Sequence, residues 1–345
     1  MLILTIDSGT TNTRTCVWKH DVVIAEASVE VGVRDTAVTG SKSRLQVGVR
    51  TSIAAALANA AVGPHDIGLV LAAGMITSNL GLFELPHVTT PAGIDDLARH
   101  MTCQLIDEVF GQPIWFIPGV RNRVSQLDLD HSEAMDMMRG EEVETFGLLA
   151  RCDVHPPALI ALPGSHSKFV HVNRQRQITG CATTLAGELL GVLTRETILA
   201  PSLESAYAND LDASMVRAGA AASRTVGLAR ACFTVRILDQ FDICGRNERA
   251  NFLLGAILGE DLLALKSSRA IARSSDIPIY IASKLLLGEA MALLLRDDDF
   301  FTGDVRMPTG EQQAHLSGFG ALQVARHAGL IPADVPLASH RSSTP

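Results

Sequence analysis

The sequence is poor in aromatic residues and carries no excess of positive charge. Aromatic side chains make up 4% of the 345 residues, and 37 Asp and Glu residues against 29 Lys and Arg residues give a net charge of −8. Nucleic-acid-binding proteins usually present a basic face, so we expect no nucleic-acid partner. The net charge does not exclude the binding of small anionic ligands, because a local cationic pocket can lie within an acidic protein.

Long hydrophobic runs and closely spaced cysteine pairs are also missing. No run of about 18 apolar residues occurs, so we expect no transmembrane helix and no membrane partner. The opening MLILTIDSG lacks the basic and apolar regions of a signal peptide. The six cysteines show no CxxC spacing, which favours buried thiols in a reducing compartment over disulfides or a zinc site. We therefore expect a cytoplasmic globular protein.

What the sequence does contain is a repeated order of elements. The length allows two domains of roughly 150 residues each. The first half begins with strand, polar turn, two further strands and a helix, and residues 157–193 repeat this order. We expect an α/β fold with an N-terminal domain at 1–135, a C-terminal domain at 136–330 and a tail at 331–345.

Hydrophobic patterning places the individual elements within these domains. In the first half it predicts strands at 2–7, 15–19, 22–32, 67–75 and 113–119, and helices at 51–62, with Thr51 as N-cap, and at 94–109. In the second half it predicts helices at 203–231, 248–267, 284–296 and 311–328, and a strand at 277–282. The alanine-rich helices fit a homodimer surface and a plain core equally well.

The first polar turn is longer than a hairpin requires. Two residues suffice for a tight hairpin, whereas six small or polar residues follow the first strand here. A glycine-containing turn between buried strands points backbone N–H groups into one concavity that suits phosphate oxygens. The candidate phosphate-binding residues are Gly9, Thr10, Thr11 and Asn12. The segment is neither a Walker A loop nor a GxGxxG motif.

Charged residues flank this turn on both sides. Asp7, at the end of the first strand, is a candidate Mg²⁺ ligand, directly or through water. Arg14, at the start of the second strand, is a candidate for neutralising phosphoryl charge. The alternative is an ordinary hairpin turn whose Asp and Thr side chains form hydrogen bonds with the backbone of the turn itself.

A second polar turn, LPGSHSK, follows a strand in the repeated half. Gly164 and Ser165 correspond to the glycine and threonine of the first turn, and Lys168 is a natural contact for a terminal phosphate. The alternative is an ordinary turn with an exposed lysine. Two duplicated domains are expected to bring both turns to one central cleft.

The segment RGEE precedes the second turn by about twenty residues. Gly140 allows a sharp change of chain direction, so Glu141 falls in the first turn of a helix, where the helix dipole stabilises a carboxylate. Glu141 is a candidate acceptor for a substrate hydroxyl proton. The alternative is a common acidic first turn, and Arg139 serves either an anionic substrate or an ion pair with Glu142.

These segments, in this order, resemble the actin/hexokinase-like ATPase superfamily, whose opening motif stands here as DSGTTNTR. More narrowly, the chain is similar to the 2-dehydro-3-deoxygalactonokinase family over about residues 1–330. The segments that carry this similarity are DSGTTNTR, GMITSNLG, FIPGV, MRGEE, LPGSHSKFV, LAGELLGVL and the pair FTVR and FLLGAILGEDL.

The resemblance implies two actin-like (ribonuclease H-like) domains and ATP-dependent phosphorylation of the 6-hydroxyl of 2-dehydro-3-deoxy-D-galactonate in galactonate catabolism. It implies ATP and Mg²⁺ as cofactors, Asp7 at the metal, and Glu141 at the position of the catalytic carboxylate. Ala282 and Ser283 fall on the adenosine-contacting segment. Ser78, Asn79 and Arg139 are the candidate partners of the sugar acid.

Three other functions compete with this one. A kinase for a different 2-keto-3-deoxy sugar acid uses the same parts. A non-sugar actin-like ATPase usually carries larger interaction domains. A sugar-responsive regulator normally has a helix-turn-helix extension, and residues 1–6 leave no room for one. We expect a sugar-acid kinase.

Overall fold

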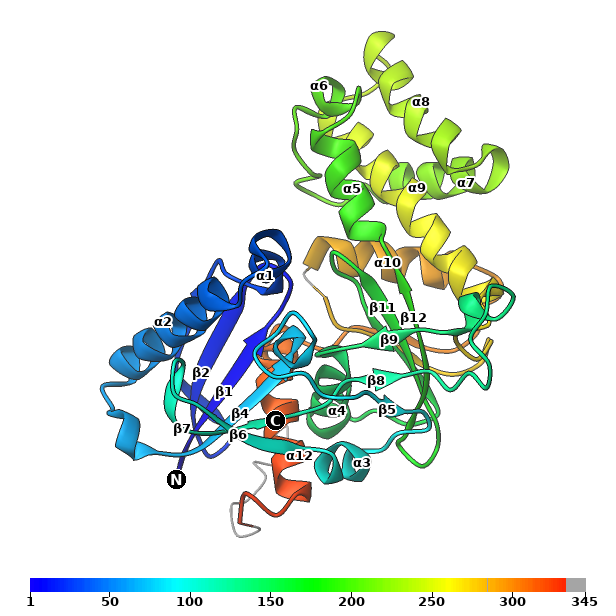
Figure 1. Cartoon of the computed structure of the whole chain (residues 1–345). Helices are drawn as coiled ribbons and strands as arrows, with labels where there is room; N and C mark the ends of the chain where they lie inside the picture. The colour runs from blue at the N-terminus through cyan, green and yellow to red at the C-terminus, as the bar shows by residue number, and fades with distance from the viewer. Residues whose placement is uncertain (284, 333–345) are drawn as a thin grey trace, which may run out of the picture. The chain divides into compact units, whose positions relative to one another are not determined.

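The computed structural model describes residues 1–283 and 285–332. The chain forms two compact units, each described by itself below (Figure 1). Unit 1 contains Met1–Arg121, Met137–Asp153 and the chain from Ala314 onward, and unit 2 contains Asn122–Asp136 and Val154–Gln313. Within the described ranges, no helix combines the length and apolar character needed to cross a membrane.

Unit 1 is built on a six-stranded sheet with the order β3-β2-β1-β4-β7-β6. Its strands are β1 (Leu2–Ser8), β2 (Thr13–Lys19), β3 (Val22–Val29), β4 (Ile67–Gly74), β6 (Thr102–Ile106) and β7 (Phe110–Phe116). A small sheet joins β5 (Val88–Thr89), β8 (Val120–Arg121) and β9 (Met137–Met138). Its helices are α1 (Val33–Thr39), α2 (Ser43–Ala60), α3 (Ile94–Arg99), α4 (Glu141–Arg151), α12 (Leu316–His327) and the 3₁₀ turns Pro64–Asp66 and Met75–Thr77.

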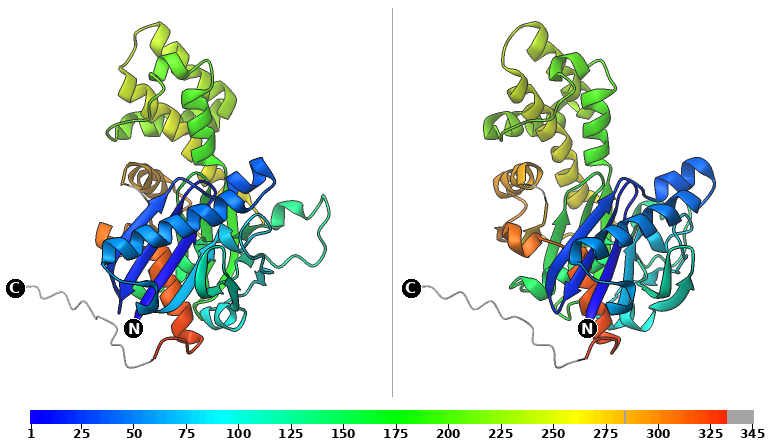
Figure 2. Two further views of the ribbon diagram at one scale, coloured as in Figure 1. Left: turned by 60° about the vertical axis from the view of Figure 1, so that its left-hand side comes forward. Right: turned by 90° about the vertical axis from the view of Figure 1, so that its left-hand side faces the viewer.

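Side chains along β1 alternate between the two faces of the sheet, and a different helix covers each face. Leu4 and Ile6 belong to the core that contains α2, whose position against the strands is visible in Figure 2. Thr5 lies on the opposite face, where it accepts a hydrogen bond from Trp18 Nε1 at 2.8 Å, and Gly318 of α12 approaches both side chains. By the same period of two, Asp7 is on the face covered by α12.

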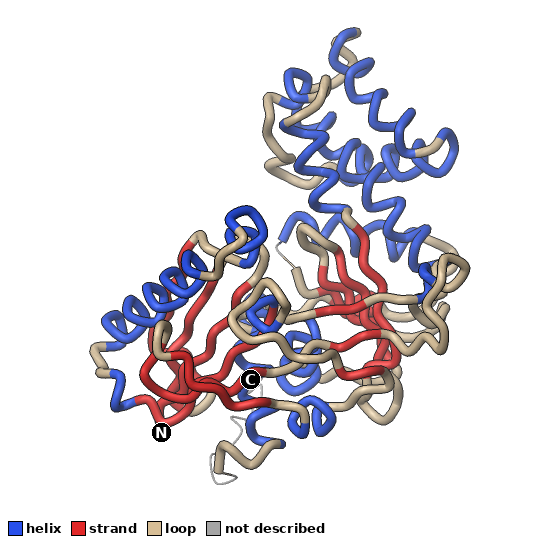
Figure 3. Tube along the Cα trace, in the orientation of Figure 1, coloured by secondary structure: helices blue, strands red, loops and turns tan. Residues whose placement is uncertain are grey.

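Unit 2 contains a five-stranded sheet with the order β12-β11-β10-β13-β14. Its strands are β10 (Ala158–Leu162), β11 (Ser167–Val172), β12 (Ile178–Thr184), β13 (Ile279–Ile281) and β14 (Val305–Arg306). Figure 3 shows helices α5 to α9 gathered beyond one end of this sheet. The helices are α5 (Ala186–Arg195), α6 (Ala200–Leu203), α7 (Ala213–Val226), α8 (Leu228–Gln240), α9 (Arg246–Ser267), α10 (Leu285–Asp297), α11 (Gly310–Gln313) and the 3₁₀ turn Ser132–Ala134.

The two units repeat one topology, as the sequence predicts. In unit 1, β1 pairs antiparallel with β2 and parallel with β4. In unit 2, β10 pairs antiparallel with β11 and parallel with β13. In both, a three-strand meander leads to two or more helices and then to a parallel strand beside the first. The expected duplicated α/β architecture is therefore present, and the central cleft stays a prediction.

The units differ from the continuous boundaries 1–135 and 136–330. Helix α4 and helix α12 pack closely in unit 1, because Gly147 lies against the Leu316 carbonyl and Gly320 against the Val143 carbonyl. These contacts assign the RGEE helix and the C-terminal helix to the first unit. The predicted tail begins too early, since Ile331 is buried, and residues 333–345 lie outside the described residues.

Several predicted elements need correction. Helix α2 begins at Ser43, so Thr51 lies inside it and is not its N-cap. The helix predicted over 94–109 ends at Arg99, and Thr102–Ile106 is strand β6, paired antiparallel with β7. The chain predicted as one helix over 203–231 is divided by Gly227, whose φ of 82° ends α7. The helix predicted over 311–328 is interrupted at His315, whose φ is 53°.

We expect Gly320→Ala to destabilise the protein by roughly 3 kcal/mol, because its Cβ would meet the rigid Val143 carbonyl. The free energy of unfolding in urea measures this effect. Gly111→Ala is the matched control, since a Cβ at Gly111 meets nothing within 4 Å. Equal small effects in both variants would show that α4 and α12 do not pack at this distance.

Candidate active site

Asp7 stands at the carboxyl end of β1, opposite Arg14 of β2 in the antiparallel register. The pKa of Asp7 is raised, chiefly by burial and further by the charge of Glu141. The Ser317 hydroxyl of α12 and the Arg14 guanidinium oppose this shift. A carboxylate in this position gains from a nearby cation, because burial otherwise disfavours its charged form.

The turn after Asp7 holds its carbonyls against α1 and exposes its side chains. Gly9 N–H donates to the Asn12 carbonyl at 2.8 Å, and the Gly9 and Thr10 carbonyls accept from Val33 and Arg34 at 3.2 and 2.9 Å. Thr10, Thr11 and Asn12 are exposed. Among the described residues, no backbone carbonyl accepts from the N–H groups of Thr10, Thr11 or Asn12. The turn can therefore offer N–H and hydroxyl donors to an anion.

Glycine allows α1 to approach this turn. A Cβ at Gly32 would lie 2.5 Å from the Thr10 carbonyl carbon and oxygen. Real Cβ atoms do not approach backbone this closely, so any side chain at Gly32 would displace the turn. The shape of the candidate phosphate loop thus depends on a residue more than twenty positions downstream.

The RGEE segment begins α4 as the sequence predicts. Gly140 has φ 113°, a conformation that favours glycine, and Glu141 is the first helical residue. Glu141 Oε2 accepts from the Arg139 N–H at 3.1 Å. The buried Glu142 carboxylate accepts from the Gly140 N–H with both oxygens, at 3.0 and 2.9 Å. Glu142 therefore serves the start of its own helix.

Close backbone packing brings this helix start to Asp7. A Cβ at Gly140 would lie 3.4 Å from Gly74 Cα, and a Cβ at Gly74 would lie 2.9 Å from Asp7 Oδ1. Gly74 itself has φ 86°. Two glycines thus allow the end of β4, the end of β1 and the start of α4 to meet.

We call Asp7, Glu141, Glu142 and Glu144 the acidic cluster. Burial raises the pKa of Glu142 to about 8, with a further contribution from Glu141. Burial also raises the pKa of Glu144 to about 8, and the charges of Asp7, Glu141 and Glu142 add to it. Like charges in a poorly solvated region disfavour full ionisation. The arrangement suits a divalent cation, which would stabilise the ionised carboxylates.

The three candidate sugar-acid residues have different surroundings. Arg139 is partly buried, and its guanidinium donates to Thr77 Oγ1 at 2.8 Å and to the Leu85 carbonyl at 2.6 Å. Burial lowers the pKa of Arg139. Ser78 is buried and donates to the Met75 carbonyl at 2.7 Å, whereas Asn79 is exposed. Ser78 and Arg139 therefore shape the loop after β4.

His87 lies beside Arg139, with its Nδ1 at 3.4 Å from a guanidinium nitrogen. Burial and the charges of Arg139 and Arg121 lower the pKa of His87 to about 4, so its ring is neutral near pH 7. The sequence did not identify His87 as a candidate site residue, because a single histidine in an apolar segment matches no binding or catalytic motif.

The second turn, in unit 2, repeats the packing of the first. The Ser165 carbonyl accepts from the Glu188 N–H of α5 at 2.8 Å. Gly187 lies against the Gly164 carbonyl, where no Cβ fits. Helix α5 therefore supports this turn as α1 supports the turn after Asp7, which extends the internal repeat to the candidate loops.

Lys168 is more enclosed than an ordinary turn lysine. Its side chain is 6% exposed, its Nζ donates to Thr183 Oγ1, and Nζ lies 3.8 Å from Asp136 Oδ1. Asp136 also accepts from the Thr183 N–H and hydroxyl, at 2.5 and 2.8 Å. Asp136 and Thr183 were not predicted, because their contact with Lys168 joins segments far apart in the sequence.

Ala282 and Ser283 lie beside the second turn. The Ala282 N–H donates to the Ala161 carbonyl at 3.0 Å, and Ser283 Oγ donates to the Pro163 carbonyl at 3.0 Å. The Ser283 N–H donates to Gln313 Oε1 at 2.8 Å. The structure thus brings together two predicted groups of unit 2, the second turn and the candidate adenosine segment.

The sequence also missed Glu144 and Ser317. Glu144 stands three residues after Glu141, which places both on one helix face, so its spacing was a usable signal. The Ser317 hydroxyl lowers the pKa of Asp7, and α12 carries it there by packing that no local pattern reveals.

The duplicated strand order and the polar turns are those of an actin-like fold. The chain belongs to the 2-keto-3-deoxy-galactonokinase family, whose family model matches residues 7–299. It is therefore a carbohydrate kinase that uses ATP and acts on a small sugar acid.

One curated relative carries the kinase name, and two solved structures match in fold. The chain is 28% identical over 273 residues to 2-dehydro-3-deoxygalactonokinase of Escherichia coli (strain K12), covering 76% of this chain and 80% of that protein. A Sinorhizobium meliloti crystal structure, provisionally named as a 2-dehydro-3-deoxygalactonokinase, matches with TM-score 0.72 at 24% identity, covering 96% and 99% of the two chains. Component A of the Acidaminococcus fermentans (R)-2-hydroxyglutaryl-CoA dehydratase matches with TM-score 0.50 at 14% identity, covering 95% and 99%.

We expect the free energy of unfolding of Glu142→Gln to increase relative to that of wild type as the pH rises from 6 to 8.5. The pKa of Glu142 is raised to about 8, so the folded state holds a proton that the unfolded state has released. The wild-type protein therefore loses on the order of 2 kcal/mol of unfolding free energy as the pH rises towards 8. Glutamine does not titrate, so the variant does not show this loss. Urea unfolding at both pH values measures the difference.

The exposed carboxylate of Glu108 provides the control, since Glu108→Gln should give the same small change at both pH values. If Glu142→Gln gives the same stability difference at pH 6 and pH 8.5, the Glu142 carboxylate is ionised throughout this range.

Proposed function

We propose that the protein transfers the γ-phosphoryl group of ATP to the 6-hydroxyl of 2-dehydro-3-deoxy-D-galactonate. The family assignment supports the reaction class. The roles proposed for individual residues rest on the acidic cluster, which lies beside an exposed polar turn. Phosphoryl transfer needs little covalent help from a protein, and mainly requires positioning, charge neutralisation and a proton acceptor. The unit 1 residues offer these parts.

The acidic cluster fits Mg²⁺. Mg²⁺ prefers carboxylate oxygens and retains several waters, so Asp7 would hold it directly or through water. When bound, Mg²⁺ would neutralise charge on the ATP phosphates. The raised pKa values of Asp7, Glu142 and Glu144 indicate that the protein supplies too little positive charge of its own here.

We assign the general base to Glu141. It begins α4, it carries charge next to Asp7, and its neighbour Glu142 is engaged by the Gly140 N–H. The hydrogen bond from the Arg139 N–H occupies one oxygen of Glu141, which fixes the orientation of the carboxylate. Glu141 would accept the hydroxyl proton as the phosphorus–oxygen bond forms.

The remaining roles follow the chemistry of each segment. The turn residues Gly9, Thr10, Thr11 and Asn12, with Arg14, are proposed to bind phosphate oxygens through N–H, hydroxyl and guanidinium donors. Gly164, Ser165 and Lys168 are proposed to do the same from unit 2. Lys168 lies beside Asp136, and Thr183 would orient its ammonium group. Ala282 and Ser283 are proposed to lie along the adenosine.

The sugar acid needs partners for its carboxylate and keto group, because burying a carboxylate without them is costly. We propose Arg139, Ser78 and Asn79 for this role. The Arg139 guanidinium has five N–H donors, and the bonds to Thr77 and Leu85 use only part of this capacity. Asn79 is exposed and so is reachable by a ligand.

A kinase for another 2-keto-3-deoxy sugar acid remains the second candidate, since the same donors recognise the shared carboxylate. A coupled ATP assay against a panel of these acids distinguishes the two. We place the reaction in the cytoplasm, where ATP is available. A homodimer is a further proposal, supported by exposed apolar residues of α5 and α8 such as Leu189 and Phe233, and sedimentation measures it.

Glu141→Gln should lower kcat by about 10²- to 10⁴-fold, the contribution typical of a positioned proton acceptor. Mg·ATP affinity should stay close to that of wild type, because Asp7 and the turn residues are unchanged. Steady-state kinetics and nucleotide titration measure the two quantities. Glu142→Gln is the matched comparison and should lower kcat far less. An inactive Glu142→Gln variant beside an active Glu141→Gln variant would show that Glu142, and not Glu141, is the base.

Arg139→Ala should raise the KM for the sugar acid by about tenfold or more, since a bond from a charged donor contributes about 1.5–3 kcal/mol. The KM for ATP should change much less. Because Arg139 also bonds Thr77 and Leu85, Arg139→Lys provides the comparison that keeps a positive charge. Equal increases in both KM values would indicate a purely structural role for Arg139.

A further inference from the structure

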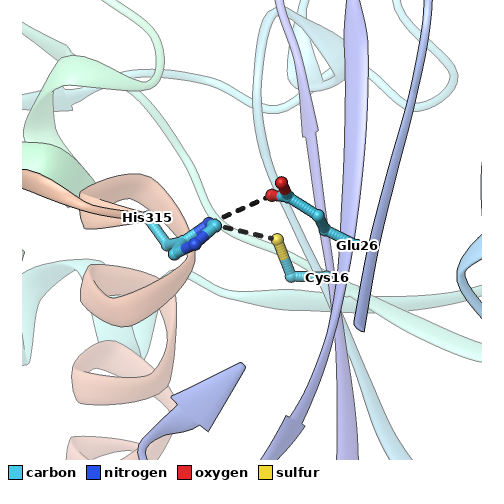
Figure 4. A group of neighbouring side chains, drawn as sticks. All are labelled: Cys16, Glu26 and His315. Carbon is cyan, nitrogen blue, oxygen red and sulfur yellow. Dashed lines mark hydrogen bonds and ion pairs between the residues drawn. The ribbon is translucent and has the colours of Figure 1, made fainter. Parts of the chain in front are cut away.

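Three side chains of different chemistry meet in unit 1 on the sheet face covered by α12. Cys16 of β2 and Glu26 of β3 are directly opposite in the antiparallel register. His315 precedes the first residue of α12. Figure 4 shows the imidazole ring pointing toward both the Cys16 sulfur and the Glu26 carboxylate. In the part of the chain that the structure describes, no other His, Cys, Asp or Glu residues gather in this way.

Two of the three distances between the candidate ligand atoms are close to the edges of a tetrahedron. His315 Nδ1 lies 3.7 Å from Cys16 Sγ and 3.4 Å from Glu26 Oε2. Around tetrahedral zinc, with Zn–S about 2.3 Å and Zn–N and Zn–O about 2.1 Å, the corresponding edges are about 3.6 and 3.4 Å. All three candidate ligand atoms lie within 4.8 Å of one another. His315 Nδ1 therefore lies close to both of the other candidate ligands, at distances that a shared metal ion allows.

The donor set selects the kind of metal. One sulfur, one imidazole nitrogen and one carboxylate oxygen suit zinc and similar transition metals, whereas Mg²⁺ prefers oxygen alone. Burial lowers the pKa of His315, so its ring offers a lone pair near neutral pH. Burial raises the pKa of the Cys16 thiol to about 12, so metal binding must release the thiol proton to solvent as the metal–sulfur bond forms.

Exposure leaves room for a further ligand. Cys16 is 4% exposed, whereas the side chains of His315 and Glu26 are 28% and 55% exposed. The carboxylate side of the group is therefore open to solvent. His315 also has φ 53°, an uncommon conformation for a residue with a side chain, and it aims the imidazole back at the strands.

We propose that Cys16, Glu26 and His315 bind one zinc-class transition metal ion in tetrahedral geometry, with water as the fourth ligand. This site is distinct from the acidic cluster, because it contains none of its four carboxylates. Bound metal would join the β2–β3 hairpin to the start of α12.

Co²⁺ is the probe, because a thiolate–cobalt bond gives a charge-transfer absorption band and tetrahedral cobalt gives strong visible bands. The full-length protein is freed of transition metals and titrated with Co²⁺ in excess Mg²⁺, which occupies oxygen-only sites. We expect one Co²⁺ per chain, with a thiolate band that Zn²⁺ removes by displacement. Zn²⁺ at about 100 times its Kd should also raise the Tm by about 5 °C.

Three variants and a control test the ligands. Cys16→Ser should abolish the thiolate band, His315→Gly, which accommodates the positive φ, should weaken Co²⁺ binding at least tenfold, and Glu26→Gln should weaken it severalfold. Glu26 is exposed, so this last variant should keep the fold even if a change at the buried Cys16 does not. Cys103→Ser removes a different thiol of unit 1 and should bind Co²⁺ as wild type does.

Two results would overturn the proposal. One is a wild-type protein that shows no thiolate band at millimolar Co²⁺. The other is a band that survives in Cys16→Ser, or that keeps its full affinity in both His315→Gly and Glu26→Gln, since either shows that other residues hold the metal.

Discussion

The crowding of four carboxylates, one buried and three partly buried, is the constraint around which unit 1 is arranged. Asp7, Glu141, Glu142 and Glu144 share one region at the carboxyl end of β1, and burial raises the pKa of Asp7 and brings those of Glu142 and Glu144 to about 8. A fold that needed only stability would separate them or replace them with apolar residues. Keeping them together is consistent with a cation that arrives with the nucleotide.

Glycine makes this concentration of charge possible. Gly74 and Gly140, both with positive φ, allow β1, β4 and α4 to approach where side chains would collide. The Gly140 N–H then holds Glu142, and the α4 dipole favours negative charge at its first turn. The backbone thus stabilises part of the acidic cluster before any ligand binds.

The sequence predicted what depends on local patterns. The strand–turn–strand order, the two polar turns and the helix beginning at Glu141 follow from alternation, turn residues and a glycine, and the structure has all of them. The failures have one origin. Residues 94–109 fit a helical pattern but Thr102–Ile106 pairs with β7, and α12 belongs to unit 1 through Gly147 and Gly320. Contacts between distant segments decide these features.

The same limit applies to the site. Asp7 and Glu141 were identifiable because their neighbours signal a turn and a helix start. The contacts of Lys168 with Asp136 and Thr183 join segments that no sequence pattern connects. The Cys16, Glu26 and His315 group was invisible for the same reason, since a spacing of 299 residues separates two of its members.

The central claim is that the acidic cluster receives the magnesium of Mg·ATP. Its most direct test is the number of protons released when Mg·ATP binds at pH 7, measured by titration calorimetry in buffers of different ionisation enthalpy. Carboxyl groups with pKa values near 8 hold protons at pH 7, and a cation placed beside them must displace these protons. The account predicts release of about one proton per chain, reduced in Asp7→Asn. Binding with no change in protonation would contradict it.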